Sequence, residues 1–201
     1  MKNIELDQGG NYYKGKGVAQ KRNVYSSFVH LLQERKPQRI IEIGTGMGGF
    51  TLFLNDIAPL QPDGRNTEIF SFELNELPWF DEIRKQGVKL SNDNIFHYEG
   101  DIFKLKEEYK ELFNIKNKIV LCDGGNKIKE FNCLSDYLFP GDIIMAHDYC
   151  TDQKTFEEML VWNWLEIQYS DIKESCERNK LIPYKGEEFL NCAWGSYICE
   201  G

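Results

Sequence analysis

The stretch IIEIGTGMGGF, residues 40–50, decides which fold this chain is expected to adopt. Its apolar start suits a buried strand and the residues after it suit a helix, so a glycine-rich turn joins the two. Gly44, Gly46 and Gly49 have the G-x-G-x-x-G spacing of a dinucleotide-binding loop, whereas Gly44, Gly46 and Gly48 fit G-x-G-x-G equally well. The spacing therefore predicts a loop that holds a ligand with its backbone, and it leaves the ligand open.

Strands and helices alternate along the rest of the chain. Apolar spacing and proline or glycine stops predict helices over residues 24–36, 48–60, 77–87, 104–115, 127–141, 154–166 and 170–180, the last with Ser170 as its cap. Strands are expected over residues 39–44, 67–74, 94–101, 118–124, 142–149 and 193–201. This alternation predicts an α/β fold in which a doubly wound, mostly parallel sheet carries helices on both faces.

Length and composition suit one domain. With 201 residues, the chain is expected to form a single unit in which residues 1–36, an N-terminal arm and helix, belong to the same domain as residues 37–201. A net charge of -8 argues against nucleic acid or an anionic membrane as the main partner. The six cysteines include no C-x-x-C pair, and no apolar run is long enough to span a membrane. The polar start of the chain is unlike a signal peptide, so a cytoplasmic protein with free thiols is expected.

Carboxylates stand at the carboxyl ends of the expected strands. They are Glu42, Glu73, Asp101, Asp123 and Asp148, the last beside His147. Parallel α/β sheets bind their ligands at this edge. The two phosphate charges of a dinucleotide would be repelled there, because Coulomb energies inside a cleft are large. A cationic ligand fits better, and S-adenosylmethionine (SAM), with a sulfonium and an ammonium group beside one carboxylate, is such a ligand.

Over residues 37–150 the chain resembles a class I SAM-dependent methyltransferase, which implies a Rossmann-like, seven-stranded sheet. The segments that carry the resemblance are IIEIGTGMGG, FSFEL and YEGD. The resemblance implies that Glu73 binds the ribose hydroxyls and that Asp101 lies near the adenine. The complete set that it places at the cofactor is Glu42, Gly44, Thr45, Gly46, Gly48, Glu73, Asp101 and Asp123. Structural roles are the alternative: Gly48 and Gly49 could allow close packing of helix on strand, and the two acids could cap helices.

The segment before the glycine loop narrows the resemblance. Residues 15–49 are similar to the entry segment of the cephalosporin hydroxylase-like and macrolide or rhamnosyl O-methyltransferase group. The residues that keep the pattern of this group are Gly17, Gln20, Tyr25, Pro37, Glu42 and Thr45. Its members carry a divalent metal, and the resemblance implies that Asp123, His147 and Asp148 are the ligands here. Oxygen ligands favour Mg²⁺, whereas a histidine in the set suits Mn²⁺ better. The metal would lower the pKa of an acceptor hydroxyl, which then attacks the methyl group.

Two positions depart from the pattern of this group. His147 stands where an acid is usual. Asn126 stands where macrolide-type relatives have a histidine base, and an amide cannot take a proton. Lys127, beside it, resembles the lysine that catechol O-methyltransferase uses in this region, and it could act as a base if its pKa is lowered. The alternative is a solvated lysine at a helix start. The catalytic region is therefore expected at Asp123, Asn126 and Lys127.

Gln20 and Tyr25 are expected to line the mouth of the site, with the arm as a lid. Further candidate contacts to the acceptor are Tyr149 at the end of the fifth strand and Trp162 in the helix that follows. The leading interpretation is a SAM-dependent, metal-assisted O-methyltransferase that acts on a hydroxyl of a small molecule, such as a sugar, a glycoside or a polyhydroxylated aromatic compound. Three alternatives stay open: a methyltransferase without a metal, a SAM-binding protein without catalysis, and a nicotinamide oxidoreductase. Exchange of the arm between subunits would give a homo-oligomer.

Overall fold

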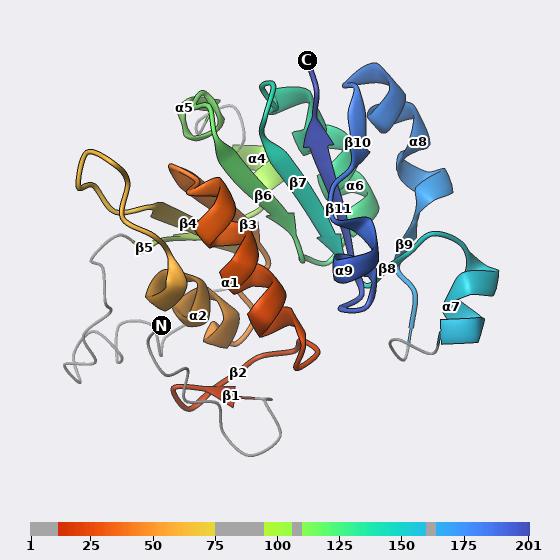
Figure 1. The fold of residues 1–201 in the computed structure, drawn as a ribbon, viewed down its shortest axis with the longest axis horizontal. Coiled ribbons are helices and arrows are strands. Elements are labelled where there is room, and N and C mark those ends of the chain that lie inside the picture. The colour runs from red at the N-terminus through yellow and green to blue at the C-terminus, as the bar shows by residue number, and fades with distance from the viewer. Residues whose placement is uncertain (1–11, 75–94, 106–109, 160–163) are drawn as a thin grey trace.

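The fold is built on a mixed sheet of seven strands, in the spatial order β10-β11-β7-β6-β3-β4-β5 (Figure 1). The computed structural model describes residues 12–74, 95–105, 110–159 and 164–201. The strands are β3 (Arg39–Ile43), β4 (Glu68–Glu73), β5 (Ile95–Glu99), β6 (Lys118–Cys122), β7 (Ile143–His147), β10 (Leu181–Pro183) and β11 (Trp194–Cys199). Strands β3 to β7 pair in parallel, and β11 runs antiparallel between β7 and β10. The expected α/β fold with a mostly parallel sheet is confirmed.

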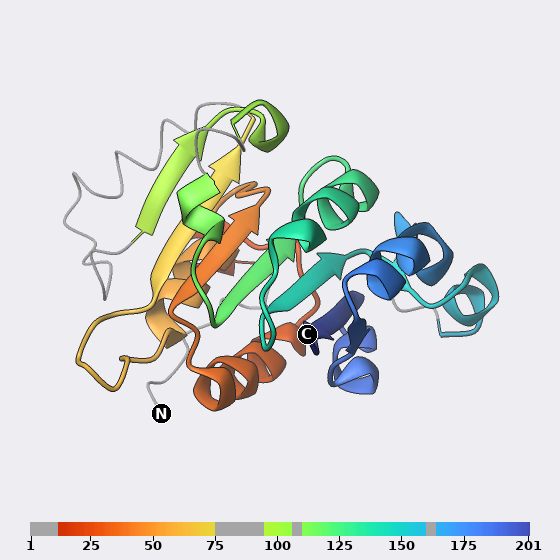
Figure 2. The ribbon, with the colours of Figure 1, turned by 90° about the horizontal axis from the view of Figure 1, so that it is seen from above.

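Helices cover both faces of the sheet (Figure 2). They are α1 (Val24–Arg35), α2 (Gly49–Ile57), α4 (Ile102–Leu105), α5 (Lys110–Phe113), α6 (Lys127–Leu134), α7 (Gln153–Met159), α8 (Tyr169–Arg178) and α9 (Gly186–Leu190), with the 3-10 turn η1 (Ser135–Tyr137) after α6. Apolar residues of α1, α2 and α9 form one core with the sheet, and those of α5, α6 and α8 form a second core on its other face. The helix expected over residues 77–87 lies outside the described residues.

The central strands contribute to both cores. On β3, Ile40 packs into the core of α1 and α2, whereas Ile41 packs into the other core. On β7, Met145 packs into the core of α1 and α2, and Ala146 packs into the other core. Successive strand residues point to opposite faces, so a strand that is buried on both faces is a continuous apolar run in the sequence. The apolar runs that predicted these strands have this origin.

The residues before α1 form a short hairpin that packs along α2. Its strands are β1 (Tyr12–Tyr13) and β2 (Lys16–Gly17), so this part of the expected extended arm folds back on the domain. The hydroxyl of Tyr13 donates to a carboxylate oxygen of Asp56 at 2.5 Å. A Cβ atom at Gly49 would lie 2.5 Å from the carbonyl oxygen of Gly17. The hairpin therefore contacts the chain where the glycine loop enters α2.

Two expected helices are shorter than the sequence suggests. The helix expected over residues 127–141 ends at Leu134 and is followed by η1. The helix expected over residues 154–166 does not reach its end, because residues 164–166 are not helical. The N–H of Glu166 donates instead to the carbonyl of Asp148 at 3.0 Å. A tertiary hydrogen bond thus replaces the helical one.

One cap and one strand also differ from expectation. Helix α8 is capped by Gln168 rather than by Ser170, in a capping box with Asp171. The backbone of Gln168 is still extended, and its N–H donates to a carboxylate oxygen of Asp171 at 2.9 Å. The seventh strand of the sheet, β10, lies in a segment where no strand was expected. It is a short edge strand whose apolar pattern is too brief to stand out.

The strand expected over residues 142–149 is interrupted at Asp148. The φ of Asp148 is 54°, in the left-handed region, so β7 ends at the preceding residue. The chain continues as β8 (Tyr149–Cys150), which pairs in parallel with β9 (Ile167–Gln168). The break redirects the chain away from the sheet at its carboxyl edge.

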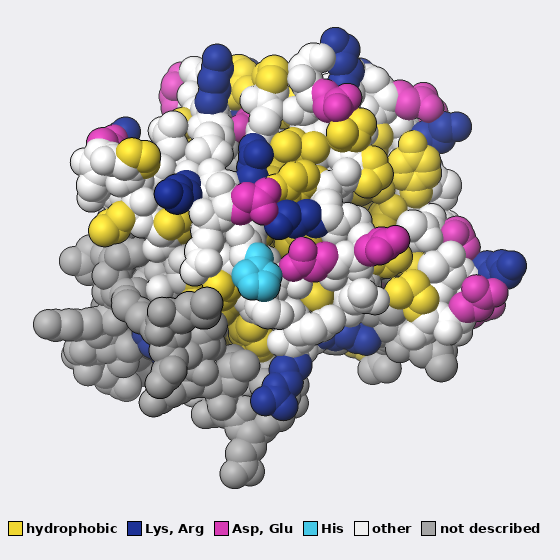
Figure 3. All heavy atoms as spheres, in the orientation of Figure 1, with side chains coloured by type: hydrophobic (Ala, Val, Ile, Leu, Met, Phe, Trp, Pro, Cys, Tyr) yellow, Lys and Arg dark blue, Asp and Glu magenta, His cyan; other side chains and the backbone are white. Residues whose placement is uncertain are grey.

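The surface seen in Figure 3 carries acidic and basic side chains that are intermixed, with apolar side chains between them. None of the helices in the described part of the chain has the length and apolar character needed to cross a bilayer. The six cysteines are free, and five of them are buried, so the expectation of unpaired thiols is confirmed. Buried thiols of this kind pack as small apolar side chains.

Candidate functional site

The glycine loop follows β3 and turns sharply at Gly44. The φ of Gly44 is 91°, and its N–H donates to the carbonyl of Phe72 on β4 at 2.8 Å. A Cβ atom at this position would lie 2.2 Å from the carbonyl oxygen of Asp123, so only glycine fits. Gly46 and Gly48 also have positive φ, and Gly48 is the N-cap of α2. A Cβ atom on Gly46 would meet no atom within 4 Å, so this part of the loop faces open space.

Glu42 lies beneath the loop, on the protein side. Its side chain is 1% exposed, and one carboxylate oxygen accepts hydrogen bonds from the hydroxyls of Thr51 at 2.6 Å and Ser71 at 2.5 Å. The hydroxyl of Ser71 lies 2.6 Å from that of Thr45. Burial raises the pKa of Glu42 to about 7, although the two hydroxyls favour the charged form. Glu42 and Thr45 thus support the loop from below, and a direct contact with a cofactor stays a prediction.

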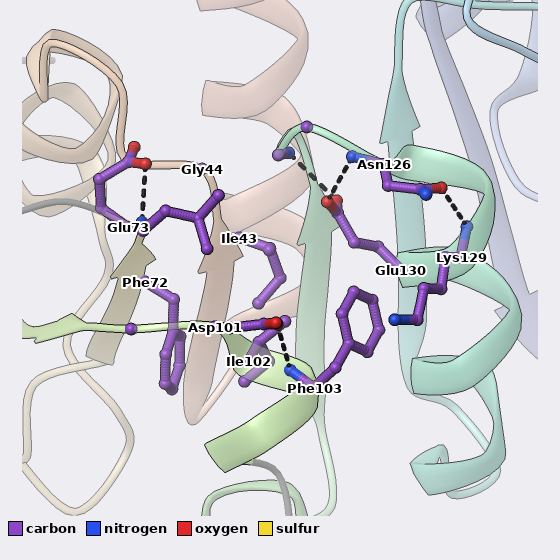
Figure 4. A pocket seen from close by; sticks show the side chains of 14 residues that line it. Ile43, Gly44, Phe72, Glu73, Asp101, Ile102, Phe103, Asn126, Lys129 and Glu130 are labelled. Atoms are coloured by element: carbon purple, nitrogen blue, oxygen red, sulfur yellow. Dashed lines mark hydrogen bonds between the residues drawn. The ribbon is translucent and has the colours of Figure 1, made fainter.

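A cavity of about 320 Å³ opens at the carboxyl ends of β3, β4, β5 and β6 (Figure 4). It is lined by Ile43, Gly44, Phe72, Glu73, Leu74, Gly100, Asp101, Ile102, Phe103, Gly124, Gly125, Asn126, Lys129 and Glu130. Glu73 lies on the opposite side from Asn126 and Glu130. Three residues expected at the cofactor, Gly44, Glu73 and Asp101, therefore share one cavity.

The carboxylates of Glu73 and Asp101 both accept backbone hydrogen bonds. Glu73 accepts from the N–H of Gly46 with one oxygen and from the N–H of Leu74 with the other, each at 2.8 Å. This ties the end of β4 to the glycine loop. Asp101 accepts from the N–H of Phe103 at 2.9 Å, so the alternative role as a helix cap is present. Each carboxylate oxygen has a further lone pair, so these contacts leave room for a ligand hydroxyl or amino group.

The opposite wall of the cavity is held by Glu130, a residue that the sequence patterns did not single out. Its side chain is buried, and its carboxylate accepts from the N–H groups of Gly124 and Asn126, each at 3.1 Å. Asn126 is the N-cap of α6, and its side chain accepts from the N–H of Lys129 at 3.0 Å. Asn126 therefore has a structural role at the position expected for a base. Glu130 could have been found from the sequence, because it is an acid in the first turn of a helix that directly follows a strand.

Asp123, His147 and Asp148 form a cluster at the ends of β6 and β7. Nδ1 of His147 lies 3.0 Å from Oδ1 of Asp123 and 3.5 Å from Oδ1 of Asp148. Neighbouring strand residues normally point to opposite faces, and the left-handed φ of Asp148 lets both side chains turn to one side. One ligand atom from each residue lies within 4.8 Å of the others. The three predicted metal ligands are thus brought together, and oxygen and imidazole donors at this spacing suit a divalent ion.

The ammonium group of Lys127 lies inside the same cluster. Its Nζ is 3.1 Å from Oδ2 of Asp148 and 3.9 Å from Oδ1 of Asp123. It also donates to Oε2 of Glu166 at 2.7 Å and to the carbonyl of Gly124 at 3.1 Å. Burial opposes the charge, but Asp123, Glu166 and Asp148 outweigh burial and raise the pKa of Lys127.

These surroundings bear on both expectations for Lys127. A general base needs a lowered pKa, and here the shift has the opposite sign. The alternative of a solvated lysine is wrong, because the side chain is only 6% exposed. Glu166, its nearest carboxylate, was not predicted, and no pattern in the sequence marks it.

The arm reaches the cluster through Gln20. Its Nε2 donates to Oδ2 of Asp123 at 2.8 Å, and its Oε1 accepts from the indole N–H of Trp194 at 2.8 Å. The indole is fully buried, and its ring centroid lies 5.0 Å from that of His147. Trp194 therefore packs in the core. Gln20 orients Asp123, and a contact between Gln20 and an acceptor stays a prediction.

The other acceptor candidates lie apart from the cluster. Tyr25 is buried in the core, with its ring edge-on to Phe53, so the prediction that it lines the mouth of the site is wrong. Tyr149 is buried as well, and its hydroxyl lies 2.6 Å from that of Tyr197. Tyr149 and Tyr197 border a second cavity of about 540 Å³, between α9 and the start of β11. Trp162 lies outside the described residues.

Solved structures match the chain over nearly its whole length. The apo-structure of CmcI-N160 aligns with a TM-score of 0.65 and 14% identity, covering 100% of this chain and 81% of that one. The O-methyltransferase TomG from Streptomyces achromogenes, in complex with SAM, aligns with a TM-score of 0.58 and 14% identity, covering 94% and 84%. An O-methyltransferase from Bacillus cereus in complex with S-adenosylhomocysteine aligns with a TM-score of 0.53 and 14% identity, covering 87% of this chain and 80% of that one.

No model of a known protein family and no curated protein sequence matches the chain. The likeness to these structures is therefore one of fold. The chain has the fold of the class I SAM-dependent methyltransferases.

Proposed function

We propose that the chain is a SAM-dependent O-methyltransferase that acts on a hydroxyl of a small molecule. The observation that carries the proposal is the cavity in which the glycine loop, Glu73 and Asp101 meet. The open backbone around Gly46 suits the amino-acid end of SAM. The carboxylate of Glu73 can accept both ribose hydroxyl protons, and Asp101 can accept from the adenine amino group. The complex of TomG with SAM supports this assignment of the cofactor.

The charge of the cavity favours SAM over a nicotinamide cofactor. Among the described residues, three carboxylates, those of Glu73, Asp101 and Glu130, line it against one ammonium group, that of Lys129. A pyrophosphate would bring two further negative charges close to these groups, whereas a sulfonium brings a positive one. A cytoplasmic location, compatible with the free cysteines, also belongs to this proposal.

The transfer itself is a displacement at the methyl carbon. The acceptor hydroxyl gives its proton to water, its oxygen forms a bond to the methyl carbon while the carbon–sulfur bond breaks, and S-adenosylhomocysteine leaves. Of the three predicted metal ligands, Asp123 is the most exposed, with 19% of its side chain accessible, so an acceptor hydroxyl would reach it first. Gln20 and His147 hold its two oxygens in place. Much of the rate enhancement is then expected from positioning.

A divalent metal also belongs to the proposal. Asp123, His147 and Asp148 would hold Mg²⁺ or Mn²⁺, which would lower the pKa of an acceptor hydroxyl. The acceptor class is proposed to be a sugar, a glycoside or a polyhydroxylated aromatic compound.

The cofactor assignment is tested by ligand-induced stabilisation. SAM and S-adenosylhomocysteine should raise the melting temperature, and NAD should not. Glu73→Gln should weaken the binding of S-adenosylhomocysteine about 10- to 100-fold, because a charged hydrogen bond contributes roughly 1.5–3 kcal/mol. Glu157→Gln, on the exposed side of α7, is the matched control. Stabilisation by NAD alone, or unchanged affinity in Glu73→Gln, would rule the proposal out.

A second candidate is a SAM-binding protein without catalysis. The observation that favours it is the use of Asn126 as a helix cap together with the raised pKa of Lys127, which leaves neither as a base. Release of S-adenosylhomocysteine during incubation with sugars and polyphenols separates the two candidates. Tight binding of SAM without release for any acceptor would support the second.

A further inference from the structure

The cluster at the ends of β6 and β7 contains a cation of its own. The Nζ of Lys127 lies 3.1 Å from a carboxylate oxygen of Asp148 and 3.9 Å from one of Asp123. The side chains of Lys127 and Asp148 are each 6% exposed. Charges that are this close and poorly hydrated interact strongly. The ammonium group therefore already compensates the carboxylates that would bind a divalent ion.

We propose that Lys127 and a divalent cation compete for the carboxylates of Asp123 and Asp148, and that Glu166 holds the ammonium group when the cation binds. The inference rests on the divalent-metal site of the proposed function, but it does not depend on methyl transfer. It predicts an exchange between two positions of one lysine side chain.

The hydrogen bonds of Lys127 make the exchange possible. An ammonium group has three donors, and here they reach Asp148, Glu166 and the carbonyl of Gly124. A divalent ion on Asp123 and Asp148 would lie within a few ångströms of Nζ and repel it. Two of the three acceptors, Glu166 and Gly124, would still be available after that shift.

The main chain holds Glu166 where it can serve as the alternative partner of the Lys127 ammonium group. Its backbone N–H donates to the carbonyl of Asp148 at 3.0 Å, and the N–H of Ile167 donates to the same oxygen at 3.4 Å. Its position relative to the cluster is therefore fixed by the main chain. Its side chain is 43% exposed, in contrast to the 6% of Asp148, so its carboxylate can follow the ammonium group toward solvent.

Direct measurement of Mn²⁺ binding, through the electron paramagnetic resonance signal of the free ion, tests the competition. Lys127→Met should bind Mn²⁺ about tenfold more tightly than the wild-type chain, or better, because it removes a neighbouring positive charge. The gain should disappear in the double variant Asp123→Asn/Lys127→Met. Lys154→Met, on an 83% exposed side chain of α7, changes the net charge equally and should leave the affinity unchanged.

Other outcomes overturn the inference. The first is an affinity of Lys127→Met for Mn²⁺ within about twofold of the wild-type value. The second is a gain in affinity that survives loss of the Asp123 carboxylate. The third is no Mn²⁺ binding by either the wild-type chain or Lys127→Met. Glu166→Gln should weaken Mn²⁺ binding severalfold, with Glu157→Gln as its control, since the lysine loses its alternative partner. Equal affinities of the two glutamine variants would contradict the role of Glu166.

A measurement on the wild-type chain covers the case in which Lys127→Met does not fold. In protein labelled with ¹⁵N-lysine, the ammonium resonance of Lys127, assigned with Lys127→Arg, should shift as Mg²⁺ is added. The shift should follow the binding curve from calorimetry. Saturable Mg²⁺ binding without a change in this resonance, or no binding, would show that the lysine and the metal do not compete.

Discussion

Replacing Glu42 by glutamine should change how the stability of the domain depends on pH. Glu42 is 1% exposed, and burial raises its pKa from 4.5 to about 7. The folded chain therefore binds this proton more tightly than the unfolded chain does. The resulting contribution to stability is fully present below the unfolded-state pKa and is lost as pH rises through the folded-state pKa.

The size of the effect follows from the shift. A change from 4.5 to about 7 corresponds to about 3 kcal/mol over its full range, since one pKa unit is about 1.4 kcal/mol. Between about pH 5.5 and about pH 8.5, the wild-type chain should lose roughly 2 kcal/mol of unfolding free energy relative to Glu42→Gln. Glutamine has no proton to lose and keeps an oxygen that can accept from Thr51 and Ser71.

Urea unfolding followed by tryptophan fluorescence at the two pH values measures this difference. Glu157→Gln, which replaces an exposed acid on α7, should show no pH-dependent difference from the wild-type chain. The reasoning fails if the difference between wild type and Glu42→Gln is constant within about 0.5 kcal/mol across this range, or if it has the opposite sign. Either result would mean that Glu42 is charged throughout, and that its two hydroxyl partners outweigh its burial.

Two further substitutions test the packing around the site. Gly44→Ala should unfold the domain or abolish binding of S-adenosylhomocysteine, because the added Cβ would lie 2.2 Å from the carbonyl oxygen of Asp123 at a left-handed φ. A circular dichroism melt measures the stability and calorimetry measures the binding. A stable variant with full affinity would contradict the described geometry of the loop. Lys118→Met should lower the unfolding free energy by roughly 3–5 kcal/mol, because it leaves the fully buried carboxylate of Asp142 without its ion-pair partner. The double variant Lys118→Met/Asp142→Asn should recover part of this loss in urea unfolding, and a further loss would argue against the ion pair as the cause.

Much of the fold could be predicted because its signals are local. The apolar runs of β3, β6 and β7 are long enough to identify strands that are buried on both faces. Acids at the ends of parallel strands had to meet at one edge, and the structure brings Asp123 and Asp148 into one cluster. Strand β10 was not predicted, because three residues at a sheet edge are too few to show an alternation of apolar and polar residues.

The details of the site depend on contacts that no local pattern encodes. Lys127 and Glu166 meet across 39 residues, through the pairing of β8 with β9. The pKa of Lys127 therefore depends on a neighbour that its own sequence context does not reveal. Tyr25 was expected with Gln20 at the mouth of the site, but the turn of α1 directs it into the core.

The left-handed backbone at Asp148 also limits how this position can diverge during evolution. Aspartate, asparagine and glycine adopt such a conformation readily, whereas other residue types are disfavoured by about 1–2 kcal/mol. The codons of aspartate become those of asparagine or glycine through single nucleotide changes. Drift can thus remove the carboxylate while the turn between β7 and β8 persists. Homologous chains with glycine at this position would share the fold but would lack this carboxylate of the ion cluster. The residue at this position therefore distinguishes homologues that keep the cluster from homologues that keep only the fold.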